Sequence, residues 1–443
     1  MRIFIPIYRA SQWFKRRFTR IGQFMTSAMV VTAVVGVDTT QSMSYQIFTL
    51  LIALLLLALI ATIRFSFPLS VQRNLPRFAT AGEPCTYTIV LNNLGAKQEA
   101  GLLLRDNLKP AFPNHGEFRT VKAPGDEKRN RFDRAIGYPR WLWLVQQKQG
   151  ARIDEIKLPE LSSNGAAKAN IGFIPLRRGT LCFSNLSIGR TDPLGLARAF
   201  MNLPCPDTLL VLPRRYPIPG IRLPGSRKYQ HGGVTLSSKV GDTEEFSSLR
   251  DYRPGDAMRH IHWKSWAKTG KPVVKDYQDE FFVRHALMLD TFALPKDADR
   301  FEEAVSVAAS LVCTVQKQDS LLDLVFVEDR AYCMTSGRNI AQAEQVLQVL
   351  GSVKACQDKS FSSLSRFVEG HAYTMSSCIC VLLAWDEPRQ ALVNNLQAME
   401  IPLLVLVITS PGDAPLDPGP MRIDQGHFHV LESGKIGEGL RTL

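Results

Sequence analysis

The chain has 443 residues, which is too long for one ordinary hydrophobic core and predicts two or three domains. Hydrophobic residues make up 45% and charged residues 21%, so most of the chain should fold. The formal net charge of +12 suits an anionic membrane surface or an acidic polymer, but Lys and Arg are spread along the chain without interleaved aromatic residues, so we expect no nucleic-acid partner.

Two apolar stretches near the N-terminus predict a transmembrane helical hairpin within a first region, 1–66. Residues 45–63 carry no charge and are long enough to approach the thickness of a bilayer core, while 21–37 form a weaker segment with small and polar residues. Basic residues precede the pair and Arg64, Arg73 and Arg77 follow it, but the connector 38–44 has none. The positive-inside rule then predicts a multi-pass protein of the inner (cytoplasmic) membrane with its soluble bulk in the cytoplasm. If the weaker segment does not cross, the soluble part lies on the opposite side.

Residues 67–215 have the texture of an all-β, sandwich-like domain. The apolar, β-branched run 87–91 ends in a turn signal at 92–95, and further short runs occur at 102–104 and 171–174. Residues 122–150 interrupt this pattern with charge and with the aromatic cluster 138–144. We expect that cluster to form a packed hairpin.

Strands and helices alternate over 283–443. Apolar runs at 283–289, 321–327, 377–385 and 402–408 are typical of parallel strands buried on both faces. Helical stripes lie between 301 and 315 and between 340 and 350, and 388–399 fits a crossover helix. The pattern predicts a doubly wound α/β domain whose functional loops lie at the carboxyl ends of its strands.

Familiar catalytic and cofactor motifs are missing from the sequence. It has no phosphate-binding loop, no dinucleotide-binding glycine fingerprint and no nucleophile elbow. The eight cysteines include no C-x-x-C pair and are expected to be reduced. The pairs His260/His262 and His427/His429 lack an acid or cysteine at a zinc-site spacing. We therefore expect neither a cofactor nor an enzyme.

A segment dense in charged, aromatic and turn residues occupies 241–270, inside a third region at 216–282. Residues 253–256 read Arg-Pro-Gly-Asp, which is typical of a turn. Two interpretations stay open for the cations around it: paired with Asp251 and Asp256 they would order the segment, and unpaired they would bind an acidic partner. We expect pairing of Arg259 with the turn, and Trp263 as a buried apolar anchor. The cations are Arg250, Arg253, Arg259, Lys264 and Lys268.

This segment resembles the bacterial domain-of-unknown-function family 58. The family pattern is matched by Arg250, Tyr252, Gly255, Asp256, Arg259, Ile261 and Trp263. Lys268 stands where the family has Arg, and His262 where it often has an acid. Upstream, Arg178-Gly179 and Asp192 to Leu196 are similar to the family's β-region motifs.

The resemblance implies that the α/β domain is von Willebrand factor A-like. It also implies work beside a MoxR-type AAA ATPase and a transglutaminase-like membrane protein, in an assembly or chaperone-linked role. Metal-binding domains of this type carry Asp-x-Ser-x-Ser after the first strand. Here Asp290 is kept, but Phe292 and Leu294 replace both serines. Asp386 could add a distal carboxylate, but without the hydroxyl ligands we expect no metal.

The sequence thus predicts a membrane-tethered interaction scaffold for a protein partner. One alternative is a membrane-bound hydrolase that uses Asp290, Asp256 and a histidine. A second alternative is a basic surface that binds an acidic polymer.

Overall fold

The computed structural model describes residues 4–35, 42–63, 65–120, 125, 130–219, 244–256, 258–279, 284–294, 297–316, 321–336 and 340–443. The connector at 38–41, most of 122–129, and 220–243 of the third region lie outside the described residues. Contacts divide the chain into two compact units. The first is Met1–Tyr216 with Ala293–Ser310 and Leu347–Gln357, and the second is Pro217–Phe292 with Leu311–Val346 and Asp358–Leu443.

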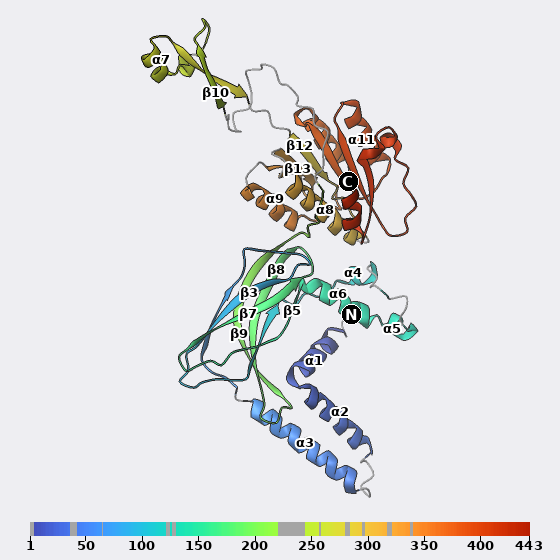
Figure 1. Cartoon of the computed structure of the whole chain (residues 1–443). Coiled ribbons are helices and arrows are strands. Elements are labelled where there is room, and N and C mark those ends of the chain that lie inside the picture. The colour runs from blue at the N-terminus through green and yellow to red at the C-terminus, as the bar shows by residue number, and fades with distance from the viewer. Residues whose placement is uncertain are drawn as a thin grey trace. The chain divides into compact units, whose positions relative to one another are not determined.

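Three helices open the chain: α1 (Phe4–Arg17), α2 (Arg20–Val35) and α3 (Ser42–Thr62). Helices α2 and α3 contact each other (Figure 1). Within the described residues one helix is long and apolar enough to cross a membrane, over Met43–Thr62, and only 11% of its most apolar stretch is buried in the chain. The second span of the expected hairpin is not supported in the same way, since α2 has 16 residues and rises about 24 Å.

The β domain consists of two sheets that enclose one core (Figure 1). Buried residues alternate along the strands, as in β7, so each sheet turns one face inward. The four-stranded sheet has the order β1 (Leu69–Asn74), β3 (Cys85–Asn93), β7 (Ala166–Pro175), β5 (Ala151–Ile153). The five-stranded sheet has the order β2 (Phe78–Thr80), β9 (Arg198–Leu212), β8 (Gly179–Thr191), β4 (Leu102–Leu108), β6 (Ile156–Lys157).

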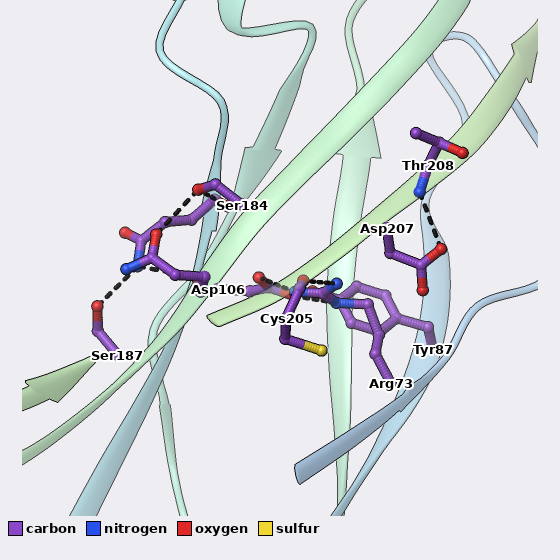
Figure 2. Close-up of polar contacts among 10 residues, drawn as sticks. Arg73, Tyr87, Asp106, Ser184, Ser187, Cys205, Asp207 and Thr208 are labelled. Carbon is purple, nitrogen blue, oxygen red and sulfur yellow. Dashed lines mark hydrogen bonds and ion pairs between the residues drawn. The ribbon is translucent and has the colours of Figure 1, made fainter. Parts of the chain in front are cut away.

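A fully buried ion pair joins the two sheets (Figure 2). Arg73 on β1 donates from Nε and Nη2 to the Asp106 carboxylate of β4, over 2.9 and 2.8 Å, and from Nη1 to the Cys205 carbonyl at 2.6 Å. The Tyr87 hydroxyl donates to Asp106 Oδ2 at 2.6 Å. Burial raises the pKa of Asp106, although Arg73 and Tyr87 oppose the shift. Arg73 therefore belongs to the core of the β domain. Its position after the apolar stretch had indicated a charge that flanks the membrane, and that expectation is wrong.

The aromatic cluster at 138–144 forms a helix, so the hairpin expected there is wrong. Short helices α4 (His115–Thr120) and α5 (Arg131–Ile136) precede α6 (Tyr138–Gln149), which has a proline in its first turn. Trp141, Leu144 and Val145 are buried at helical spacing. The Trp141 ring contacts Phe4 and Tyr8 of α1, so this helix gives α1 its packing surface.

The second unit contains a six-stranded sheet of order β14-β13-β12-β15-β16-β17. All neighbouring strands are parallel except β14, which runs antiparallel at one edge. The strands expected from the apolar runs are confirmed as β12, β13, β15 and β16, whereas β14 and β17 were not expected. The bounds are β12 (Arg284–Leu289), β13 (Leu321–Val327), β14 (Ala331–Ser336), β15 (Ser377–Leu382), β16 (Leu403–Thr409) and β17 (Phe428–Glu432). The main helices along this part of the chain are α8 (Ala298–Gln316), α9 (Ile340–Ser352), α10 (Ser362–His371) and α11 (Glu387–Ala398), and a short α12 (Ile436–Gly439) follows β17.

Candidate functional site

The segment with the family pattern forms a two-stranded ribbon that carries a small helix (Figure 1). Strands β10 (Glu244–Asp251) and β11 (Val273–Asp279) are antiparallel, and between them lie the 3₁₀ helix η2 (Met258–His260) and α7 (Trp263–Thr269). Ile261 bridges to Val274, and both side chains are buried together with Val273. We call residues 244–279 the signature ribbon.

An arginine–aspartate pair fixes the turn of the signature ribbon. Arg250 Nη1 and Nη2 donate to the two Asp256 carboxylate oxygens, each at 2.7 Å, and the Arg253 backbone N–H donates to Oδ2 at 2.8 Å. The hydrogen bond from Arg250 lowers the pKa of Asp256 to about 2. Gly255 has φ +107°, a conformation that favours glycine. The backbone of Tyr252 donates to the Pro272 carbonyl at 3.0 Å and closes the turn against the start of β11.

Arg259 does not join this pair, in contrast to the expectation from sequence. Its side chain is exposed, and its Nε donates to His260 Nε2 at 3.0 Å. Arg250 on β10 already binds both carboxylate oxygens of Asp256. Arg259 lies on η2, after this turn, and does not pair with Asp256. Asp256 is therefore structural, and Arg259 is available at the surface.

Trp263 is exposed, so its expected role as a buried anchor is wrong. It is 63% exposed and stacks on Trp266, with ring centroids 5.3 Å apart and planes 18° from parallel. None of the residues of α7 is buried. The small core of the signature ribbon is formed by the aliphatic side chains of Ile261, Val273 and Val274, and neither indole of α7 is buried in it.

The stacked tryptophans are accompanied by exposed cations. Lys264 and Lys268 lie one helical turn apart on α7, and both are exposed, as are Arg259 and Met258 on η2. We call these six residues the tryptophan surface: Met258, Arg259, Trp263, Lys264, Trp266 and Lys268. It combines apolar area with positive charge, as protein-binding sites for acidic partners do.

A second polar cluster lies where β12 and β15 end. Asp290 is fully buried, and its carboxylate accepts backbone N–H groups of Phe292 and Leu383, both at 3.0 Å. Arg389 Nε donates to Asp290 Oδ2 at 2.7 Å, and its Nη1 donates to Asp386 Oδ2 at 2.6 Å. A guanidinium thus stands between the two carboxylates that a metal ion would need to share.

The surroundings of this cluster do not fit a metal ion either. The Arg389 guanidinium lies over the Phe361 ring at 4.6 Å, and Phe292 packs edge-on against the same ring. Leu294 is exposed and carries no ligand atom. Thr291 donates its hydroxyl to the Val327 carbonyl. Among the described residues no group of three or more His, Cys, Asp and Glu side chains could hold a metal.

Sequence reasoning missed Arg389, although a signal for it exists. Asp386 caps the first turn of α11, and Arg389 follows three residues later on the same helix. That spacing indicates a local pair, and only the strand order brings Asp290 to the same guanidinium. Asp290 and Asp256, the two acids of the hydrolase alternative, are each held by an arginine.

The histidine pairs are occupied by hydrogen bonds. His427 Nδ1 contacts Asp424 Oδ1 at 2.6 Å, and His429 Nε2 contacts the Gly426 carbonyl at 3.1 Å. Asp424 lies three residues before His427, and among the described residues this contact is not part of a group of three metal-ligating side chains.

Comparison with known proteins adds a family match over the signature segment. Residues 248–360 match the family model described as "Protein of unknown function DUF58". A protein of Bacillus subtilis (strain 168), "Uncharacterized protein YeaD", is 26% identical over 174 residues, which are 38% of this chain and 41% of that protein. The chain therefore spans less than half the length of this relative.

Solved structures also show distant likeness. The ASH/PapD-like domain 7 of human CEP192 is 15% identical, with a TM-score of 0.18, over 34% of this chain and 91% of that domain. The CARDB domain of PF1109 from Pyrococcus furiosus is 12% identical, with a TM-score of 0.17, over 33% and 97%. At these scores the likenesses carry no argument. The family match over residues 248–360 and the Bacillus relative together support the resemblance of this chain to the DUF58 family.

Proposed function

We propose that this chain is a membrane-tethered interaction scaffold that binds a protein partner through the tryptophan surface. The observation that carries the proposal is the stack of exposed Trp263 on half-buried Trp266 on α7, the helix that follows the turn held by Arg250 and Asp256. A rigid aromatic pair loses little conformational entropy on binding, and tryptophan and arginine are enriched at binding hot spots. The surrounding cations favour an acidic partner.

The membrane anchor in this proposal is α3, with α2 as the second arm of a hairpin. The apolar side chains of α3 are largely uncovered by the rest of the chain. Those of α2 are also exposed, including Phe24 at 76% and Val34 at 72%. Lipid is the environment in which such side chains are stable on both helices. With basic residues before α2 and after α3, the soluble domains lie on the cytoplasmic side of the inner membrane.

The partner we propose is a MoxR-type AAA ATPase, with a transglutaminase-like membrane protein as a further member of the assembly. We also assign the α/β domain to the von Willebrand factor A-like type. Its mainly parallel sheet, with Asp290 directly after β12, supports that assignment. Because Arg389 pairs with both Asp290 and Asp386, the surface at the strand ends of this domain needs no metal ion. We therefore propose the signature ribbon as the main contact with the partner.

The test is capture of the partner by the full chain from native membranes in mild detergent, followed by mass spectrometry. Trp263→Ala with Trp266→Ala should lose an AAA ATPase that the unchanged chain retains, with no change in melting temperature. Tyr373→Ala is the matched control, because Tyr373 is also exposed, at 78%, and lies outside the signature ribbon. Equal recovery of the ATPase by the double variant and the control would refute binding through the tryptophan surface.

A further inference from the structure

The turn between β8 and β9 contacts both the start of α2 and the end of α3. Asp192 organises this turn: its Oδ1 accepts the Ala197 N–H at 2.6 Å and its Oδ2 accepts the Leu194 N–H at 3.1 Å. Both backbone bonds hold residues 192–197 in a compact loop. We call these six residues the socket loop.

The start of α2 is bound to the socket loop through the backbone. Thr19 donates its N–H to the Leu196 carbonyl at 3.0 Å and its hydroxyl to the Gly195 carbonyl at 2.6 Å. Phe18 forms an isolated β-bridge with Ala197. A Cβ at Gly22 would lie 2.0 Å from the Leu196 carbonyl oxygen, so the helix can approach the loop this closely only with glycine there.

The end of α3 meets the same loop. Ala58 is completely buried against Leu196 and Ala197, one turn before the helix ends at Thr62. Arg17, the last residue of α1, donates from Nη2 to the Thr62 hydroxyl at 3.1 Å. The loop, the end of α1 and the exit of α3 therefore lie at one level along the α3 axis.

If α3 spans the bilayer, this level is the boundary between hydrocarbon and headgroups. Its 20-residue, mainly apolar stretch Met43–Thr62 covers about 30 Å, the thickness of the hydrocarbon core. Thr62 then lies at the edge, and Leu196 and Ala197 lie beside Ala58 just inside it. Leu194, at the tip of the socket loop, is 43% exposed. At this depth its side chain can contact the edge of the lipid hydrocarbon.

Basic residues crowd at the same level. Lys15, Arg16 and Arg20 are exposed around the junction of α1 and α2. Partial burial of the Arg16 guanidinium and the neighbouring Arg105 lower the pKa of Arg16, with Tyr8 and Glu155 opposing. Two further arginines that flank the loop have acidic partners: Arg190 pairs with Glu99 and Arg198 with Glu155.

We propose that the socket loop and the α1–α2 junction form a docking surface for anionic phospholipid headgroups, with Leu194 inserted at the edge of the hydrocarbon. The inference rests on the proposed anchoring by α3 and goes beyond it. Lys15, Arg16 and Arg20 attract headgroup phosphates, and Trp13, which is 59% exposed on α1, suits the interfacial zone. The surface fixes the β domain against the membrane instead of leaving it on a free tether.

Depth measurements on the full chain test the position of the socket loop. A fluorophore on Leu194→Cys is compared with one on Leu176→Cys, in a Cys333→Ser background, because Cys333 is the exposed cysteine. Leu176 is a matched control at 40% exposure, but it precedes β8 whereas Leu194 follows it, so the two lie about 40 Å apart. In vesicles of phosphatidylcholine and phosphatidylglycerol, headgroup-level nitroxide lipids should quench the Leu194 site and leave the Leu176 site unchanged.

Lipid selectivity tests the charge. Spin-labelled phosphatidylglycerol should bind the reconstituted chain in preference to phosphatidylcholine, and Arg16→Gln with Arg20→Gln should lower that preference about fivefold for each arginine lost. Arg366→Gln with Arg441→Gln, two exposed sites elsewhere, is the control and should leave it unchanged. Extraction at alkaline pH is measured in parallel. A chain that resists extraction but shows no quenching at Leu194 and no lipid preference overturns this inference and leaves the anchor intact. A chain that is extracted refutes the anchor itself.

Discussion

Replacing Arg389 with methionine should strongly destabilise the end of the sheet in the α/β domain. The substitution keeps most of the side-chain volume but removes the cation from Asp290, whose carboxylate is fully buried. Burial alone would lower the pKa of Arg389, but Asp290 and Asp386 outweigh it and the pKa is raised, so the folded protein holds the charge firmly. Breaking a buried pair from one side costs about 3–5 kcal/mol, a large part of a domain's total stability.

Hydrogen exchange on the full chain in detergent, read by mass spectrometry, measures this loss locally. Peptides from β12 and β15 should exchange roughly 10²- to 10³-fold faster in Arg389→Met, because each 1.4 kcal/mol is a factor of ten. Arg366→Met on α10 is the control, since that side chain is exposed and surface changes stay within about 0.5 kcal/mol.

The double variant Asp290→Asn with Arg389→Met distinguishes the effect of losing the ion pair from the effect of changed packing. With both charges gone, no uncompensated carboxylate remains, so protection should recover in part relative to Arg389→Met. If Arg389→Met exchanges like the control, the guanidinium is not the counter-ion of Asp290 and our account of the cluster is refuted.

Three further outcomes are expected. Mg²⁺ should not raise the melting temperature, although a ligand at a hundred times its Kd would add about 2.7 kcal/mol; a rise that Asp290→Ala abolishes would contradict the poor fit of this site. Carboxyl NMR should place the pKa of Asp256 at about 2 and return it toward 3.8 in Arg250→Ala. Because the folded pKa is the lower one, the pair stabilises the turn above about pH 4 and that contribution disappears as the pH falls through 2. Gly22→Ala should lower the melting temperature by overpacking the socket, at about 1–3 kcal/mol, whereas Gly172→Ala, with open space at its Cβ, should not; equal effects would show that the close approach at Gly22 is unimportant.

The amino-acid sequence alone determined the elements whose signal is local. The uncharged stretch 45–63 corresponds to α3, because an apolar run on all sides of a helix is visible without knowledge of any contact. The alternation of apolar runs and helical stripes after 283 predicted β12, β13, β15 and β16 and the helices α8, α9 and α11, but not β14, β17 or α10. The hairpin predicted for the aromatic run 138–144 was wrong because the spacing of this run also fits a helix. The burial of Trp141 on one face favoured the helix over the hairpin.

Only the tertiary structure decided the pairing of charges and the exposure of large side chains. Arg73 and Asp106 are 33 residues apart, and Asp290 and Arg389 are 99 apart, so their ion pairs depend on which strands become neighbours. Trp263 was expected to be buried because it is large and apolar, yet the core of a two-stranded ribbon is already filled by Ile261, Val273 and Val274. Periodicity records which way a side chain points from its own backbone, whereas burial and charge pairing depend on what the fold places opposite it.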